Sequence, residues 1–269
     1  EKFDVTLDLS LSSQYGFFLF CTGIPKRIGY DYRGRGRFLT HKIRLIGYSG
    51  KHMVEYYKDL LSYFGLKPAD EIPKISLPAK DIDWSLEFLR QNGISEKDVL
   101  IAIAPGGGAS WGKDAIYKHW MADGFANVAD ALAEAHNAKI ILLGDSSDCG
   151  ICESVLNIMK HKPVLACGKT GLLKFAALLK RCKVLVCNDG GPLHVAAAVG
   201  TKTASVFGPV DERVYGPYPK DANHVVIKNT INCRPCYKNF RFRQCKTIEC
   251  LRSVEPRQVI EAVNRLMGK

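Results

Sequence analysis

Apolar and polar positions follow a regular pattern in the second part of the chain, after residue 98. Short apolar runs rich in β-branched residues alternate there with segments of about ten residues whose apolar positions recur at helical spacing. Such alternation predicts βαβ units and a parallel, doubly wound sheet. The predicted strands are 99–105, 139–144, 163–167, 183–188, 203–208 and 224–229, and the predicted helices are 121–136, 149–160, 171–180, 192–199 and 255–266.

The first part of the chain also begins with a strand and a helix but is less regular. The pattern predicts a strand over 3–9, a helix over 10–20, a loop and short strand over 24–30, a helix over 52–66 that ends at Gly65, an irregular link over 67–80, and a helix over 83–93. The polar junction 94–98 separates the two parts. We therefore expect one domain over residues 1–95 and a second over 96–269.

A glycine turn follows the predicted strand 183–188, and a helix-forming segment that opens with Pro192 follows the turn. The amides of a first helical turn have no intrahelical acceptors, so the turn at Gly190 and Gly191 can hold a phosphate. Asp189 would stand at the strand's carboxyl end and accept sugar hydroxyls, while His194 can donate to phosphate. An ordinary loop between strand and helix is the alternative, but this pair favours a sugar joined to phosphate.

Composition describes a globular chain of 269 residues with 46% apolar residues. The net charge of +11 favours polyanionic partners, which include nucleic acid, phosphorylated glycans and anionic membrane surfaces. The longest early apolar run, 16–24, is far shorter than the roughly 20 residues that span a bilayer. We find no signal peptide, and because the chain starts inside a strand without Met, we expect it to continue a longer protein.

Ten cysteines are present, and four of them lie within apolar segments. We expect these four, Cys21, Cys167, Cys182 and Cys187, to be small buried side chains in a protein of a reducing compartment. Four others, Cys233, Cys236, Cys245 and Cys250, lie among basic residues near the end of the chain. Their spacing allows zinc, but the second pair is too widely spaced for a usual zinc cluster, so a structural loop is the default interpretation.

A basic stretch covers residues 26–51, with eight Lys or Arg residues against one acid, Asp31. Its cations include Arg33, Arg35 and Arg37. A solvated charged loop and a docking surface for an anionic acceptor both explain such a stretch. The sequence leaves these two alternatives open.

A second glycine-rich loop follows the predicted strand 99–105. It lacks the ending of a P-loop and does not match the dinucleotide-binding pattern. Gly108 and Ser110 could line a diphosphate, with an exposed cation supplied by Lys113 or Lys118; we prefer Lys118 because Trp120 anchors its segment in the core. Glycines that merely form a loop remain the alternative.

These motifs together resemble glycosyltransferase family 9, the bacterial ADP-heptose:lipopolysaccharide heptosyltransferases. The resemblance rests on Asp189-Gly-Gly-Pro-Leu-His194-Val-Ala-Ala-Ala, Phe207-Gly-Pro209, Lys118-His-Trp120 and the glycine loop before it. It implies an α/β fold of the GT-B type, with two Rossmann-like doubly wound domains facing across a cleft. The first domain, which binds the acceptor, would be incomplete, and the second would bind the sugar nucleotide.

The resemblance also implies roles for single residues. Lys118 would pair with the diphosphate, Asp189 would bind heptose hydroxyls, the turn from Gly190 to His194 would hold the phosphates, and Thr170 would lie near adenine. The reaction would be metal-independent and inverting, without a cofactor. The family's general base should precede Glu1, so a sugar-nucleotide-binding module without catalysis is the alternative.

Partners follow from the same resemblance. We expect an ADP-heptose-type sugar nucleotide and a lipopolysaccharide inner-core acceptor, with Arg33, Arg35 and Arg37 on the acceptor side. We expect a cytoplasmic protein bound peripherally to the inner face of the cytoplasmic membrane. Nucleic acid is not expected, because net charge alone suggests it and no recognition motif supports it.

Overall fold

The computed structural model describes residues 2–68, 72–107, 109–242 and 245–268, without the side chains at positions 109, 110 and 113. The chain forms two compact units. The first contains Glu1–Glu71, Arg213–Tyr215 and Cys236–Arg243, and the second contains Ile72–Glu212, Gly216–Pro235 and Gln244–Lys269. No helix in the described ranges combines the length and apolarity needed to cross a bilayer.

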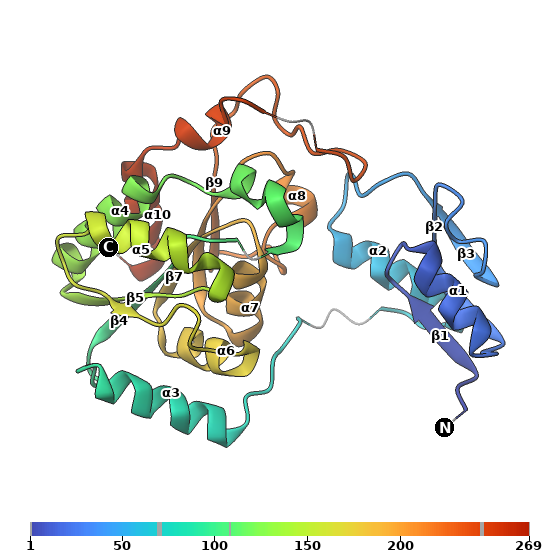
Figure 1. Ribbon diagram of the computed structural model, residues 1–269, viewed down its shortest axis with the longest axis horizontal. Coiled ribbons are helices and arrows are strands. Elements are labelled where there is room, and N and C mark those ends of the chain that lie inside the picture. Colours follow the sequence, from blue (N-terminus) through green and yellow to red (C-terminus); the bar gives the residue numbers. More distant parts are fainter. Residues whose placement is uncertain (1, 69–71, 108, 243–244, 269) are drawn as a thin grey trace. The chain divides into compact units, whose positions relative to one another are not determined.

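The second unit is built on a six-stranded parallel sheet with the order β6-β5-β4-β7-β8-β9 (Figure 1). Its strands are β4 (Val99–Ala104), β5 (Ala138–Leu142), β6 (Val164–Leu165), β7 (Val184–Asn188), β8 (Lys202–Val206) and β9 (His224–Ile227). The chain runs outward from β4 through β5 to β6 and then returns to place β7 on the other side of β4. The predicted doubly wound parallel sheet is therefore confirmed, and its order reverses between β4 and β7.

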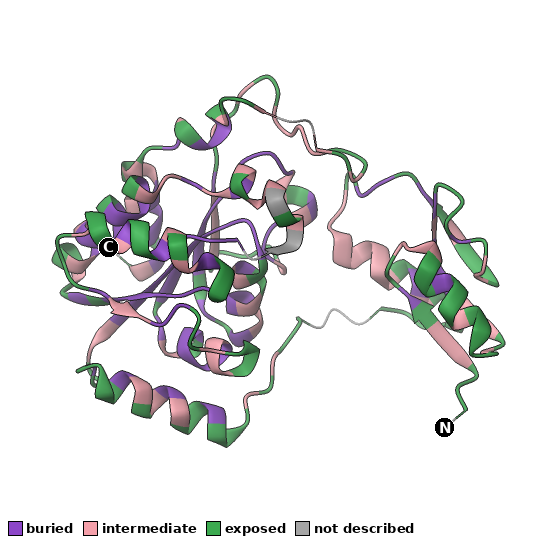
Figure 2. Cartoon of the chain, in the orientation of Figure 1, coloured by how far each residue is buried: buried purple, intermediate pink, exposed green. Residues whose placement is uncertain are grey.

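Helices cover both faces of this sheet, as their buried residues require. They are α3 (Ala79–Gln91), α4 (Ala122–His136), α5 (Cys149–Ile158), α6 (Leu172–Arg181), α7 (Gly191–Val199), α9 (Glu249–Arg252) and α10 (Pro256–Met267), with 3-10 turns η2 (Ala109–Lys118) and η3 (Ser146–Asp148). Most of the short helix α8 (Glu212–Tyr215) belongs to the first unit. Alternate strand residues such as Ile101, Ile103 and Val186 pack with Leu132 of α4 and Val263 of α10 in one core. Figure 2 shows the central strands β4, β7 and β8 as mostly buried.

Every predicted strand and helix of the regular second part is present, with ends within a few residues of the predicted ones. Helix α3 begins at Ala79, four residues before its predicted start. Helix α7 begins at Gly191 with Pro192 in its first turn and ends at Gly200, which adopts a left-handed conformation (φ 80°). The short elements η2, η3, α8 and α9 were not predicted, because so few residues give no periodicity.

The boundary between the units differs from the predicted one. The division falls at residues 71 and 72, so α3 belongs to the second unit and not to the first domain as expected. Helix α3 packs on α6, with Lys174 of α6 over the ring of Trp84. The polar junction 94–98 is thus a turn between α3 and β4, and its composition does not mark the limit of a unit.

The first unit is smaller and has a three-stranded parallel sheet in the order β1-β2-β3. Its elements are β1 (Val5–Asp8), α1 (Ser13–Cys21), β2 (Lys26–Tyr32), β3 (His41–Leu45), α2 (Met53–Asp59) and the 3-10 turn η1 (Leu60–Phe64). Gly65 ends η1 in the left-handed conformation (φ 65°), as predicted. Strand β3 was not predicted, because its alternating residues lie within the basic stretch.

Residues from late in the sequence complete the core of the first unit. Val214 is buried among Ile28, Tyr30, Tyr48 and other core residues, and Phe240 packs against the same cluster. The ring centroid of Phe240 lies 4.9 Å from that of Tyr48. The prediction that all of 96–269 forms the second domain is therefore wrong for these segments, since their apolar side chains are buried in the first unit.

Trp120 gives a stability test of the second core, because its ring packs directly on Gly124 of α4. A Cβ atom at Gly124 would lie 2.7 Å from Cζ2 of Trp120, whereas one at Gly150 of α5 would meet nothing within 4 Å. We expect Gly124→Ala to lower the free energy of unfolding by about 1–3 kcal/mol through overpacking. Gly150→Ala, the control, should leave it unchanged or raise it by up to about 1 kcal/mol. Urea denaturation measures both, and equal effects would contradict this packing.

Candidate functional site

The loops after β4 and β7 meet where the strand order reverses, and Asn188 joins them. Its Nδ2 donates to the carbonyl oxygens of Pro105 (2.6 Å) and Gly106 (3.1 Å). Its Oδ1 accepts from the backbone N–H of Trp120 (2.9 Å). One buried side chain thereby fixes both glycine loops and the segment that carries Lys118. Open α/β sheets bind ligands at this place, outside the carboxyl ends of the strands.

Glycines allow the two loops to touch. A Cβ atom at Gly190 would lie 2.4 Å from the carbonyl oxygen of Gly107, so only glycine fits there without moving a backbone. A Cβ atom at Gly191 would meet nothing within 4 Å, and this residue is exposed at the start of α7. The two neighbouring glycines thus differ: Gly190 is needed for packing, while Gly191 leaves the helix N-terminus open.

Lys118 and Asp189 form a buried ion pair between these loops. Lys118 Nζ lies 2.7 Å from Oδ2 of Asp189, although without the direction of a hydrogen bond. Lys118 is 7% exposed and Asp189 is 4% exposed. Lys118 Nζ also lies 4.9 Å from the ring centroid of Trp111. The prediction that Lys118 is an exposed cation is therefore wrong, because its charge is held inside the site by a carboxylate.

Trp120 anchors this lysine segment, as predicted. Its side chain is 1% exposed, and its Nε1 donates to the carbonyl oxygen of Val254 (3.1 Å). The ring also lies against Phe125, with centroids 5.1 Å apart. Since Trp120 follows Lys118 by two residues, the core fixes where the Lys118 backbone lies.

His119 and Asp148 lie beside the pair. Burial lowers the pKa of His119, the charge of Lys118 lowers it further, and Asp148 acts in the opposite direction. His119 is therefore neutral at pH 7, and its buried Nε2 has no hydrogen-bond partner within the described ranges. Asp148 is buried against the β4 loop, since a Cβ atom at Gly106 would lie 2.0 Å from its Oδ1.

The other predicted site residues of this unit lie near the same edge of the sheet or outside the described part. His194 is exposed in the first turns of α7. Thr170 lies in the loop after β6, and its buried Oγ1 has no hydrogen-bond partner among the residues described. Gly108 and the side chains of Ser110 and Lys113 lie outside the described residues.

Arg234 holds the loop after β8, which contains Phe207-Gly-Pro209. Its guanidinium donates to the carbonyl oxygens of Gly208 (2.7 Å) and Val210 (3.2 Å) and pairs with Glu212 at 3.0 Å. Burial alone would raise the pKa of Glu212, but hydrogen bonds from Lys228 and Arg234 outweigh it, so this pKa is lowered. The arginine between Cys233 and Cys236 thus has a structural contact that the cysteine spacing did not indicate.

The cysteines behave in part as predicted. Cys167, Cys182 and Cys187 are buried, but Cys21 is exposed at the end of α1, so that prediction is wrong. Cys21 lies on the outward side of a helix that is apolar nearly all round, and sequence pattern does not tell which side is covered. In the described ranges no three His, Cys, Asp or Glu side chains are grouped for a metal, so the zinc alternative gains no support there.

Comparisons with known proteins show the family of this chain. The sequence model of Glycosyltransferase family 9 (heptosyltransferase) matches residues 1–246. The chain belongs to glycosyltransferase family 9. It is 26% identical over 192 residues to "Lipooligosaccharide heptosyltransferase 2" of Campylobacter jejuni, a match that covers 70% of this chain and 58% of the relative. This chain thus spans less than two thirds of that relative's length.

Two solved structures share the fold. A glycosyl transferase of family 9 from Veillonella parvula has a TM-score of 0.82 and 24% identity, covering 99% of this chain and 74% of the other. The Escherichia coli ADP-heptose lps heptosyltransferase II has a TM-score of 0.77 and 21% identity, covering 98% and 76%. At these identities the likeness shows the fold alone. It confirms the predicted α/β fold of the family 9 glycosyltransferases.

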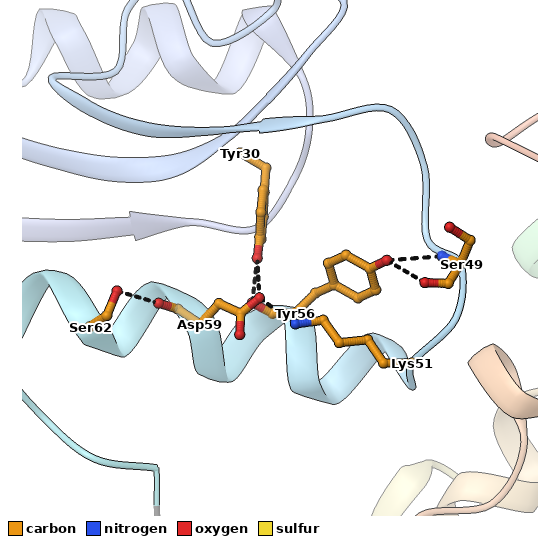
Figure 3. A network of polar contacts seen from close by, with 6 residues as sticks. All are labelled: Tyr30, Ser49, Lys51, Tyr56, Asp59 and Ser62. Atoms are coloured by element: carbon orange, nitrogen blue, oxygen red, sulfur yellow. Dashed lines mark hydrogen bonds and ion pairs between the residues drawn. The ribbon is translucent and has the colours of Figure 1, made fainter.

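The basic stretch of this family 9 chain contains two kinds of cation. Four are used within the first unit: Lys26 and Arg27 donate to backbone carbonyls, Lys42 pairs with Asp31, and Lys51 pairs with Asp59. Figure 3 shows Lys51 beside Asp59, in a network in which Tyr30 also donates to the Tyr56 carbonyl (2.6 Å). These four cations already have partners within the unit.

The remaining arginines are exposed. The guanidinium carbons of Arg33 and Arg35 lie 5.1 Å and 5.5 Å from the ring centroid of Tyr32, and that of Arg37 lies 4.7 Å from Phe38. All three follow β2 in the loop that leads to β3. A hollow of about 600 Å³ in this unit is lined by Arg33 together with Lys42 and Arg44. Of the three predicted acceptor-side residues, only Arg33 lines this hollow.

Sequence reasoning missed Asn188, His119, Asp148 and Arg234. Asn188 and His119 stand next to predicted site residues, so position along the chain was an available signal. Asp148 and Arg234 are brought in by the folding of separate loops, and nothing in their local sequence distinguishes them.

The adjacent glycines of the α7 turn provide a test of the site's packing. Because its Cβ would collide with the Gly107 carbonyl, Gly190→Ala should lower the free energy of unfolding by about 1–3 kcal/mol. Gly191→Ala is the matched control and should change it by less than about 0.5 kcal/mol. Chemical denaturation of both variants decides this, and a larger loss in Gly191→Ala would refute the assigned contact.

Proposed function

We propose that this protein transfers heptose from ADP-heptose to the lipopolysaccharide inner core, with inversion at the anomeric carbon. The observation that carries the proposal is the buried Lys118–Asp189 pair beside an open helix N-terminus, at the sheet's reversal point. A cation, a carboxylate and helix-end amides in one place suit a ligand that joins phosphate to sugar. Family membership supports the reaction class, and ADP-heptose is the donor named for the Escherichia coli structure.

The diphosphate would bind at Lys118 and the start of α7. An ammonium group has three donors, and the ion pair with Asp189 uses one direction, so others remain for phosphate oxygens. The amide of Gly191, at the start of α7, lacks an intrahelical acceptor, and exposed His194 adds a donor. Lys118 and the turn after β7 would thus both compensate the negative charge of the phosphates.

The sugar would lie against Asp189. Lys118 contacts Oδ2, so Oδ1 can accept hydrogen bonds from heptose hydroxyls. Thr170, whose Oγ1 has no partner within the described ranges, would contribute a hydroxyl toward adenine.

The reaction would be a single displacement. The acceptor hydroxyl attacks the anomeric carbon and loses its proton to a general base outside the residues assigned here, while the bond from that carbon to the diphosphate breaks and ADP leaves. Lys118 and the helix-end amides would stabilise the charge that builds up on the departing diphosphate. These fixed groups support a transfer that needs no metal ion.

The acceptor would bind to the first unit. Arg33, Arg35 and Arg37 are exposed, and each is held over an aromatic ring. Because these side chains are already restricted, binding would cost less conformational entropy. Lipopolysaccharide carries phosphates and acidic sugars, so a cationic surface is complementary to it. The same surface supports peripheral binding to the cytoplasmic face of the inner membrane.

Substituting both members of the buried pair separates function from stability. Lys118→Met or Asp189→Asn alone should lower the free energy of unfolding by about 3–5 kcal/mol, because one buried charge is left unpaired. The double variant should recover most of that loss, since no charge remains unpaired. It should nevertheless bind ADP roughly 10–100-fold more weakly and lose heptose transfer by at least about 100-fold.

Calorimetric titration with ADP and a transfer assay with ADP-heptose and lipopolysaccharide acceptor measure these effects. A stable double variant with unchanged ADP affinity and transfer would remove the pair from the site. An unmodified protein that binds ADP-heptose but transfers nothing would favour the sugar-nucleotide-binding module.

The three arginines can be tested against a matched set on the second unit. Changing Arg33, Arg35 and Arg37 to Gln should raise the Michaelis constant for the acceptor roughly 10-fold and leave that for ADP-heptose unchanged. Added salt should weaken acceptor binding by the original protein more than by this variant. The control is Arg90→Gln, Arg252→Gln and Arg257→Gln, all exposed, which should change neither constant. A selective loss of nucleotide affinity in the first set would reverse the assignment of the two units.

A further inference from the structure

Two thiols from different loops lie against each other at the carboxyl edge of the second sheet. Cys149 Sγ and Cys167 Sγ are 2.7 Å apart. Cys149 opens α5 after β5, and Cys167 follows β6. A disulfide bond is about 2.04 Å long, so the sulfur atoms need to approach by only about 0.7 Å to be joined. Both are free thiols in the structure.

Contacts between the two loops hold the backbone beside the two sulfurs. The Gly168 N–H donates to the Gly144 carbonyl (3.1 Å), which ties the two loops together directly beside Cys167. Gly168 has φ 70°, and a Cβ atom there would lie 3.1 Å from Cys149 Sγ, so glycine leaves the room that this sulfur occupies. Both thiols also point to one acceptor, the carbonyl oxygen of Asp145, at 3.6 Å and 3.0 Å.

The two thiols differ in solvent exposure, so they would have different roles in a reaction with a soluble reagent. Cys149 is half-buried and is the first residue of a ten-residue helix. Cys167 is 6% exposed, and burial together with the neighbouring Cys149 raises its pKa. A third thiol, Cys152, is fully buried and is directed to the Leu143 carbonyl.

We propose that Cys149 and Cys167 are a reversible thiol–disulfide site, oxidised by low-molecular-weight disulfides such as oxidised glutathione. Cys149 Sγ attacks one sulfur of the reagent, the reagent's S–S bond breaks, and a mixed disulfide forms as the first thiol leaves. Cys167 Sγ then attacks Cys149 Sγ, and the second thiol leaves. The two protons of the cysteines end on the two released thiols, so one disulfide is reduced for each one formed.

The bridge would tie the loops after β5 and β6, which belong to different βα units. It would close a loop between residues 149 and 167 and restrict the unfolded chain. The oxidised protein should therefore unfold at a temperature higher by about 6–12 °C, and dithiothreitol should reverse the shift. This inference does not depend on the proposed transfer activity.

The test is incubation of the reduced, folded protein with oxidised glutathione, followed by alkylation and peptide mapping by mass spectrometry. We expect a linked pair of peptides that contains Cys149 and Cys167, together with the rise in unfolding temperature. Cys167→Ser should instead retain one glutathione on Cys149, because the second step has no nucleophile. Cys149→Ser should give neither product at these positions.

Controls separate this pair from the other thiols. Cys152→Ala removes the nearest third thiol and should still form the bridge, and Cys233→Ser, at an exposed cysteine, should behave like the unmodified protein. A linked peptide that survives in Cys149→Ser would overturn the proposal. So would an unmodified protein that acquires glutathione at Cys233 but no bridge between 149 and 167, a result that needs no variant to fold.

Discussion

The site depends on one buried amide, that of Asn188. Its three hydrogen bonds join the loop after β4 to the end of β7 and to the backbone of Trp120. Each such bond contributes about 1 kcal/mol net, but leaving any of these buried partners unpaired costs more. Gly190 can lie against the Gly107 carbonyl only because it has no side chain, so the amide of Asn188 and this glycine together set how closely the two loops approach.

The charged pair follows from this arrangement. Once Trp120 is fixed by the core and by Asn188, Lys118 stands two residues earlier and reaches Asp189, the residue after Asn188. Two buried charges are stable only when they compensate each other, which explains why the lysine is not an exposed cation. Positioning by the core also means that the fold itself holds the ammonium and the carboxylate in place.

The first unit follows a different principle. Its core is completed by Val214 and Phe240, which are separated from Ile28 by most of the chain. Burial of apolar side chains, not nearness in sequence, decides which unit a segment joins. In the same unit, half of the cations in the basic stretch are bound to backbone carbonyls or carboxylates. The number of charges in the sequence therefore overstated how many cations are free to bind a partner.

The sequence by itself determined the order of strands and helices in the second unit, the α7 turn and the family, because periodicity and turn residues act over a few neighbours. It also indicated Lys118 and Asp189 singly. Only the tertiary structure decided that they pair, that α3 joins the second unit, that Cys21 is exposed, and that Cys149 meets Cys167. These outcomes depend on which loops and helix faces the fold brings together. The local sequence pattern does not indicate the distance between residues that are far apart in the chain.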